Sequence, residues 1–101
     1  MSKIKYRISK QAITDLNSIW VYTLHKWFKK QADRYYNLII DEIEFISKNY
    51  LSGKSVDQTR KNYRVTKIKS HLIFYRKTDN ETIEIVRILH QKMDVKKLLN
   101  T

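Results

Sequence analysis

The spacing of apolar residues changes abruptly about midway along the chain. In the first half they recur at steps of three and four, which predicts two amphipathic helices near residues 10–25 and 30–48. The second half has short runs rich in β-branched and aromatic residues, which predict strands at about 62–69, 70–77 and 82–90. This order predicts an α+β fold in which a helical hairpin packs on a small antiparallel sheet.

Short segments at the two ends complete this prediction. Ile4, Tyr6 and Ile8 alternate with basic residues, as expected of a half-buried first strand. The Ser9 hydroxyl can cap the helix that follows it, and Asp94 can cap a short C-terminal helix. Residues 50–61 contain the single glycine and are irregular in composition, so they are interpreted as a loop.

Turns at residues 69–70 and 79–81 join the strands of the second half and set their register. The pairs expected from these turns are Val65–Phe74, Arg64–Tyr75, Phe74–Val86, Leu72–Ile88 and Arg76–Glu84. The face predicted to form the core beneath the helices collects Val65, Leu72, Phe74, Val86 and Ile88. The opposite, open face collects Arg64, His71, Ile73, Tyr75, Ile85, Arg87 and Leu89.

The composition excludes several classes of protein. A length of 101 residues suits a single domain, residues 1–101, and the lack of cysteine excludes disulfides and thiolate catalysis. One glycine and no proline leave no glycine-rich phosphate loop. The three histidines have no zinc-ligand spacing, so no metal and no other cofactor is expected. With no apolar run that would span a membrane and no apolar signal core, the expected location is the cytoplasm.

The chain carries a large excess of positive charge. It has 21 Lys and Arg residues against 10 Asp and Glu residues, a formal net charge of +11. Such a surplus favours polyanions or acidic proteins as partners, although a solubilising lysine surface explains it equally well. Arg64, Arg76 and Arg87 stand inside predicted strands, where a guanidinium must keep water or a partner anion. The sheet is therefore expected to bind a negatively charged partner.

Short motifs occur in a characteristic order in both halves of the chain. The second half contains YR at 63–64, HLIFYR at 71–76, IEIVRILH at 83–90 and KMD at 92–94, followed by Leu98. The first half contains Ser9, Ala12, Asp15, Leu16, Ile19, Trp20 and Tyr22, then Gln31, Ala32 and Tyr36. Over residues 4–99 the chain resembles the ParE branch of the RelE/ParE toxins of type II toxin–antitoxin systems.

The resemblance implies a partner and a mode of action. It implies inhibition of DNA gyrase by binding rather than by hydrolysis, neutralisation by a ParD-like antitoxin in a hetero-oligomer, and only indirect contact with nucleic acid. An acidic antitoxin segment that folds on the sheet would cover the basic strand residues and the tail. The expected partner-binding residues are Arg64, Arg76, Arg87, His90, Met93 and Asp94.

A RelE-like, ribosome-dependent mRNA endoribonuclease on the same fold is the alternative. Cleavage would need a base for the 2′-hydroxyl, a cation for the phosphorane and an acid for the leaving oxygen. The candidates would be Arg64, Tyr75, Arg87 and His90, a loose set that favours the binding mode instead. For His90 the structural alternative is a strand-end histidine bonded to the backbone or to Asp94.

Aromatic and basic residues alternate around the predicted connection between the helices. Trp20, Trp27 and the tyrosine pair at 35–36 fall on helical stripes and are expected in the core. The flanking polar positions are interpreted as a solvated face, with a docking surface for the target as the alternative. They are Tyr22, Lys26, Lys29, Lys30 and Arg34.

Overall fold

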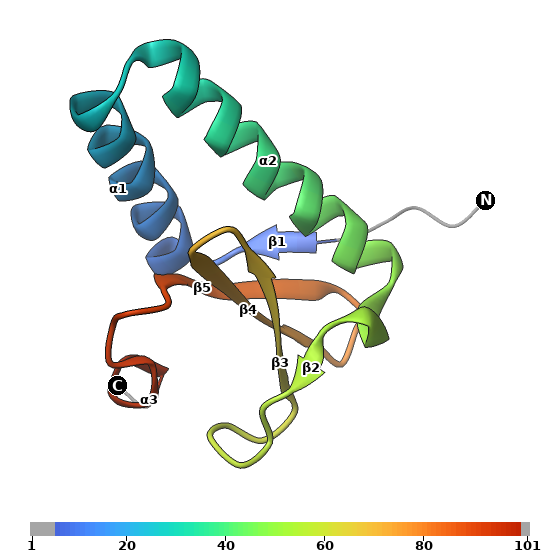
Figure 1. The fold of residues 1–101 in the computed structure, drawn as a ribbon. Coiled ribbons are helices and arrows are strands. Elements are labelled where there is room, and N and C mark those ends of the chain that lie inside the picture. The colour runs from blue at the N-terminus through green and yellow to red at the C-terminus, as the bar shows by residue number, and fades with distance from the viewer. Residues whose placement is uncertain (1–5, 100–101) are drawn as a thin grey trace.

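A helical hairpin covers one face of a five-stranded sheet in the computed structural model, which describes residues 6–99 (Figure 1). The elements are β1 (Tyr6–Ile8), α1 (Lys10–Lys26), α2 (Lys29–Lys48), a 3₁₀ turn (Tyr50–Ser52), β2 (Lys54–Ser55), β3 (Tyr63–Ile68), β4 (His71–Lys77), β5 (Ile83–His90) and α3 (Val95–Leu99). The strand order is β1-β5-β4-β3-β2, with β1 parallel to β5 and the other neighbours antiparallel. The predicted α+β fold is confirmed. Ile4, which was predicted to belong to the first strand, lies outside the described residues.

Both predicted helix caps are confirmed. The Ser9 hydroxyl accepts a hydrogen bond from the Ala12 amide at 3.0 Å, which fixes the start of α1. The Asp94 carboxylate accepts one from the Lys97 amide at 3.2 Å and so begins α3. Among the residues described, no helix is both long and apolar enough to cross a membrane.

The segment predicted as a loop contains the two-residue strand β2. Such a strand is too short to show alternation, and it forms because Lys54 and Ser55 pair with Val65 and Arg64 of β3. Gly53 comes just before it, where a Cβ atom would overlap the Tyr75 hydroxyl and lie 2.7 Å from the Val65 carbonyl oxygen. Close approach of the backbone, rather than an unusual φ, therefore requires glycine here.

The register is as predicted in the first hairpin but only partly so in the second. Val65–Phe74, Arg64–Tyr75 and Arg76–Glu84 are paired as expected. A β-bulge between Phe74 and Tyr75 then shifts the rest of the pairing. The predicted pairs Phe74–Val86 and Leu72–Ile88 are wrong, because Phe74 lies opposite Arg87 and Leu72 opposite Leu89.

The chain before α1 holds the bulged strand in place. The Ser9 amide donates to the Ile85 carbonyl at 3.0 Å and its hydroxyl donates to the Val86 carbonyl at 2.8 Å. Beyond Ile85, β1 no longer pairs with β5, so these bonds satisfy an edge that would otherwise be open. No sequence pattern within β5 predicts this contact, which joins residues 77 positions apart.

The predicted core face is wrong except at Ile88, because both faces of the sheet are buried. Beneath the helices lie Ile73, Tyr75 and Ile85, which were expected on the open, cationic face, and also Ile83. Ile88 lies beneath the helices as predicted. Phe74 and Leu89 form a second, smaller core on the other face with Leu99 of α3. Val65 and Leu72, also expected beneath the helices, pack against this second core. Sorting apolar from cationic residues therefore could not identify the helix-covered face.

Candidate partner-binding surface

The predicted partner-binding residues are spread along the length of the paired strands β3, β4 and β5. The register runs from the pair His71–His90 at one end to the pair Lys77–Ile83 at the other. Arg76 lies next to the second end, whereas Arg64 and Arg87 lie opposite Tyr75 and Phe74, near the middle of β4. His90 lies at the first end, and Met93 and Asp94 follow it shortly after β5.

Arg64 and Arg87 do not form the single cationic face that was predicted. Arg64 lies opposite Tyr75, and Arg87 lies opposite Phe74. Tyr75 and Phe74 are consecutive, and their side chains belong to the two different cores. The predicted register, which put both arginines beside Tyr75 on one face, is therefore wrong.

Arg64 holds together the segment between α2 and β3. Its guanidinium donates to the Gly53 carbonyl at 2.6 and 3.2 Å and to the Leu51 carbonyl at 3.3 Å. The guanidinium also lies over the Tyr50 ring, 5.5 Å from its centroid. These contacts use most of the donor capacity of Arg64 inside the fold.

Tyr75 is fully buried beneath the same segment. Its hydroxyl donates to the Tyr50 carbonyl at 2.8 Å and accepts from the Gly53 amide at 3.0 Å. Burial raises the pKa of this phenol, so it stays protonated well above neutral pH. A buried hydroxyl that is bonded within the protein argues against the ribonuclease role considered for Tyr75.

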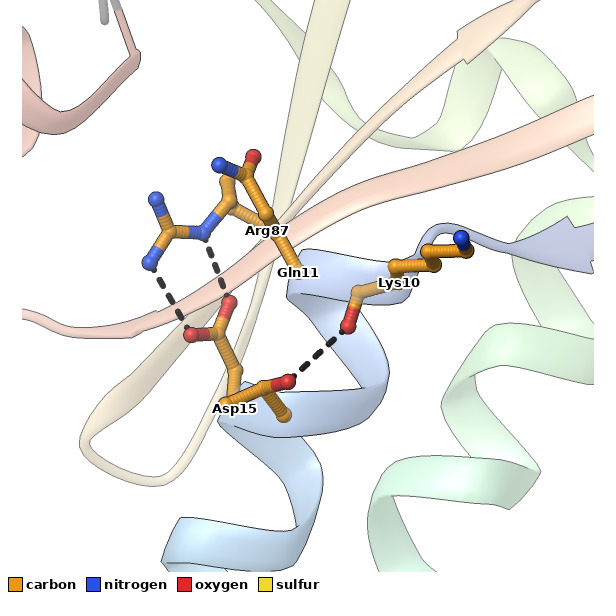
Figure 2. A pocket seen from close by; sticks show the side chains of 5 residues that line it. Lys10, Gln11, Asp15 and Arg87 are labelled. Carbon is orange, nitrogen blue, oxygen red and sulfur yellow. Dashed lines mark hydrogen bonds and ion pairs between the residues drawn. The ribbon is translucent and has the colours of Figure 1, made fainter.

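Arg87 forms a paired, mostly buried contact with Asp15 of α1 (Figure 2). Its Nε lies 2.8 Å from one carboxylate oxygen and its Nη2 lies 3.0 Å from the other, while the Ile88 amide donates to Asp15 at 2.9 Å. The two side chains are 15% and 13% exposed. The hydrogen bonds from Arg87 to Asp15 are the main reason that the pKa of this guanidinium is raised.

The Arg87–Asp15 pair has one side open to solvent. It lines a shallow hollow of about 200 Å³ with Lys10, Gln11 and Thr14 of the first turns of α1. Figure 2 shows the Gln11 side chain beside Arg87 and the Lys10 side chain pointing away from the ion pair. The sequence identified Asp15 only as a motif residue, because no sequence spacing predicts its contact with Arg87, 72 positions away.

Arg76 belongs to a more exposed ion-pair cluster. Its Nε lies 2.7 Å from one Glu84 oxygen, and Arg7 of β1 lies 3.1 Å from the other. The arginine side chains are 38% and 60% exposed, so water screens both pairs. A partner carboxylate can reach Arg76 more readily than Arg64.

His71 and His90 meet at the end of the sheet where β3 turns into β4. Their rings are nearly perpendicular with centroids 5.1 Å apart, and His71 Nδ1 lies 2.6 Å from the Tyr35 hydroxyl. His90 Nδ1 accepts from the Lys92 amide at 3.1 Å, which confirms the backbone-bonded alternative for this residue. No set of three His, Cys, Asp or Glu side chains within residues 6–99 is placed to hold a metal ion.

Stability should fall as the pH is lowered toward the pKa of His71. Burial, and secondarily the charge of His90, lowers this pKa from 6.5 to about 4. Between about pH 4 and pH 6.5 the unfolded chain binds a proton at His71 that the folded chain excludes. The stability that depends on neutral His71 is therefore complete above pH 6.5 and is lost as the pH falls. We expect a loss of about 1–2 kcal/mol between about pH 7 and pH 4.5, allowing for partial exposure.

Urea unfolding of matched variants checks this prediction. His71→Gln should flatten the pH dependence relative to the wild-type chain, whereas His25→Gln, at an exposed position of α1, should leave it unchanged. Equal pH dependence in all three proteins would show that His71 is not the group responsible.

Met93 and Asp94 complete this end of the molecule. Met93 is 51% exposed, and its amide donates to the His90 carbonyl at 3.0 Å. Lys92, Lys96 and Lys97 around it are exposed. The arrangement is an apolar side chain within a basic surface, which suits an acidic segment carrying apolar residues.

The family assignment follows from comparison with known proteins. Residues 6–95 match the family model described as the ParE toxin of the type II toxin–antitoxin system parDE. The chain belongs to the ParE toxin family. Toxin ParE1 of Mycobacterium tuberculosis (strain H37Rv) is 37% identical over 91 residues, which cover 90% of this chain and 93% of that protein. Toxin ParE1 of Caulobacter vibrioides is 35% identical with the same coverage.

The fold of this ParE family member also matches a solved structure. A chain from the chromosomal ParDE TA system of P. aeruginosa superimposes with a TM-score of 0.74 at 15% sequence identity. The match covers 86% of this chain and 95% of that one. The shared feature is the arrangement of the helical hairpin and the sheet.

Proposed function

We propose that this ParE-family toxin acts in the cytoplasm, where it inhibits DNA gyrase by binding and is neutralised by a ParD-like antitoxin. One observation carries the choice of binding over catalysis. The residues that a ribonuclease would use are bonded within the protein, since Tyr75 is fully buried, Arg64 holds loop carbonyls and Arg87 holds Asp15.

The spacing of the same residues supports this choice. His90 lies opposite His71, four positions along β4 from Tyr75. At a rise of about 3.3 Å per strand residue, these positions are about 13 Å apart. A base and an acid that act on one phosphodiester must both come within hydrogen-bond reach of it. The set therefore does not converge on a single scissile bond.

Induction of the toxin in bacterial cells tests the binding mode. We expect the DNA-damage response to rise while ribosome-bound messages stay intact, because a poisoned gyrase leaves damaged DNA and does not cleave RNA. Reporter fusions and primer extension on abundant messages give the two readouts. Rapid cleavage of messages without a DNA-damage response would instead support the ribonuclease alternative.

For the antitoxin we propose docking on the end of the sheet that carries His90, Met93 and Asp94, extending along β5 to Arg87. Support comes from Met93, which is 51% exposed, and from the exposed lysines that flank it. An acidic segment that orders on contact gains apolar burial at Met93 and charge complementarity around it. Contact with Arg64, near the middle of β3, and with Arg76, toward the far end of β4, remains a prediction.

Met93→Glu should weaken antitoxin binding about tenfold or more, because it replaces an apolar contact with a charge that repels an acidic segment. Phe45→Glu is the matched control, since Phe45 lies on α2 and is also 51% exposed. Isothermal titration with the purified antitoxin measures both affinities. Weakening by the Phe45 variant alone would place the antitoxin on the helical hairpin.

A further inference from the structure

Three aromatic side chains are exposed at the connection between α1 and α2. Tyr22 is 65% exposed, Trp27 58% and Phe28 73%. The expectation that Trp27 lies in the core is wrong, because α1 ends at Lys26 and the chain turns away before α2. The hairpin extends beyond the sheet, so this connection projects away from the strands (Figure 1).

The same region has a strongly positive electrostatic potential. His25, Lys26, Lys29, Lys30 and Arg34 are all exposed. Asp33 is the one acidic residue among residues 22–34, and it is bonded to Lys29 at 2.7 Å and to the Trp20 indole at 2.9 Å. Lys26 lies over the Tyr22 ring, 5.6 Å from its centroid. Basic and aromatic residues thus alternate along this exposed connection.

The start of α2 adds to this potential. Phe28, at the N-cap position, provides no side-chain hydrogen bond, and the first turn contains no acidic residue. The first amides of a helix and its dipole favour an anion, and proteins usually place a capping or acidic side chain there. At this end of α2 the sequence places lysines instead.

We propose that this hairpin tip, made of Tyr22, Lys26, Trp27, Phe28 and Lys30, binds single-stranded nucleic acid. Exposed aromatic rings that stack bases, beside cations that contact phosphates, are the combination used by proteins that bind single strands. The tip combines three exposed aromatic rings with its lysines, and the stacking of bases on such rings favours nucleic acid over an acidic protein. The proposal replaces the expectation of only indirect contact with nucleic acid.

The inference does not rest on gyrase inhibition, and its test needs only the purified toxin. The probe is a fluorescein-labelled oligothymidylate, with binding measured by anisotropy over a series of salt concentrations. Trp27→Ala should weaken binding about tenfold, as expected for loss of one stacked base. Lys26→Ala/Lys30→Ala should make the dependence of log K on log salt shallower by about 1.4, about 0.7 for each phosphate contact.

Two control variants separate the hairpin tip from general basicity. Lys96→Ala/Lys97→Ala on α3 removes the same charge far along the chain, and it should leave the salt dependence unchanged. Phe45→Ala removes an aromatic residue that is 51% exposed elsewhere on α2, and it should leave the affinity unchanged. Circular dichroism and melting temperature establish that each variant is folded.

Tryptophan fluorescence locates the contact directly. The chain contains two tryptophans, Trp20 and Trp27. Unlabelled oligothymidylate should quench the wild-type emission, and Trp27→Phe should retain binding but lose most of this quenching.

Equal losses for the tip and α3 lysine pairs, or unchanged affinity for Trp27→Ala, would overturn the proposal. A glutamate-rich peptide of matched charge serves as the protein-like competitor. If Trp27→Ala weakens binding of this peptide but not of the oligonucleotide, the hairpin tip is a protein-docking surface instead.

Discussion

Truncating Phe74 to alanine should lower the free energy of unfolding by about 3–5 kcal/mol, as is usual for a fully buried aromatic residue. Phe74 is 2% exposed and lies in the second core, between the sheet and α3. A domain of this size has about 5–10 kcal/mol of stability in total, so the variant should be close to unfolding at room temperature. Urea unfolding followed by far-ultraviolet circular dichroism measures the loss.

A double-mutant cycle tests where Phe74 packs. Leu99→Ala removes a side chain from the same core, and it should show a coupling energy of about 0.5–3 kcal/mol with Phe74→Ala. Ile39→Ala, in the core beneath the helices, should combine additively. Coupling to Ile39 and not to Leu99 would mean that Phe74 faces the helices, as the sequence-based register had it.

Removal of Asp15 should have the second largest effect. Asp15→Ala leaves both Arg87 and the Ile88 amide without their partner in a site where the two side chains are 15% and 13% exposed. Removing one member of a buried pair costs about 3–5 kcal/mol, and we expect about 3 kcal/mol because one side of this pair is open. Urea unfolding provides the measurement.

Two further variants show whether burial explains this effect. Lys29→Ala removes an ion pair whose side chains are 75% and 45% exposed, and it should leave the stability nearly unchanged because water screens the pair. Asp15→Ala/Arg87→Ala should be more stable than Asp15→Ala alone, because no unpaired guanidinium remains. The account is wrong if Asp15→Ala is as mild as Lys29→Ala.

The helices were predictable because their signals are local. Apolar spacing defined their extents to within about two residues, and Ser9 and Asp94 are caps that a short sequence window reveals. The first hairpin was predictable for the same reason, since a tight turn at Lys69–Ser70 leaves one register.

The second hairpin was not predictable, because its register depends on distant contacts. The bulge lies where Ser9, 77 positions away, bonds the Val86 carbonyl. Beyond a bulge, every residue of the strand lies on the face opposite to the one that simple alternation predicts. Both faces of this sheet carry apolar side chains. Alternation alone therefore could not distinguish the face beneath α1 and α2 from the face beneath α3.

The sequence could nominate residues for a candidate site, but it could not predict their contacts. Motif resemblance selected Asp15 and Arg87 separately, while their contact spans the whole fold. Interior arginines were expected to meet water or a partner, yet Arg64 and Arg87 are satisfied mainly by loop carbonyls and by Asp15. Composition cannot reveal an internal partner of this kind.

Supercoiling by purified DNA gyrase, measured with and without the purified toxin, tests the proposed function most directly. We expect the toxin to block conversion of relaxed plasmid to supercoiled plasmid at concentrations comparable to those of gyrase, and a ParD-like antitoxin added beforehand should restore it. A parallel reaction with ribosomes and a defined message should show no cleavage. Unimpaired supercoiling together with cleavage of the ribosome-bound message would contradict the proposal.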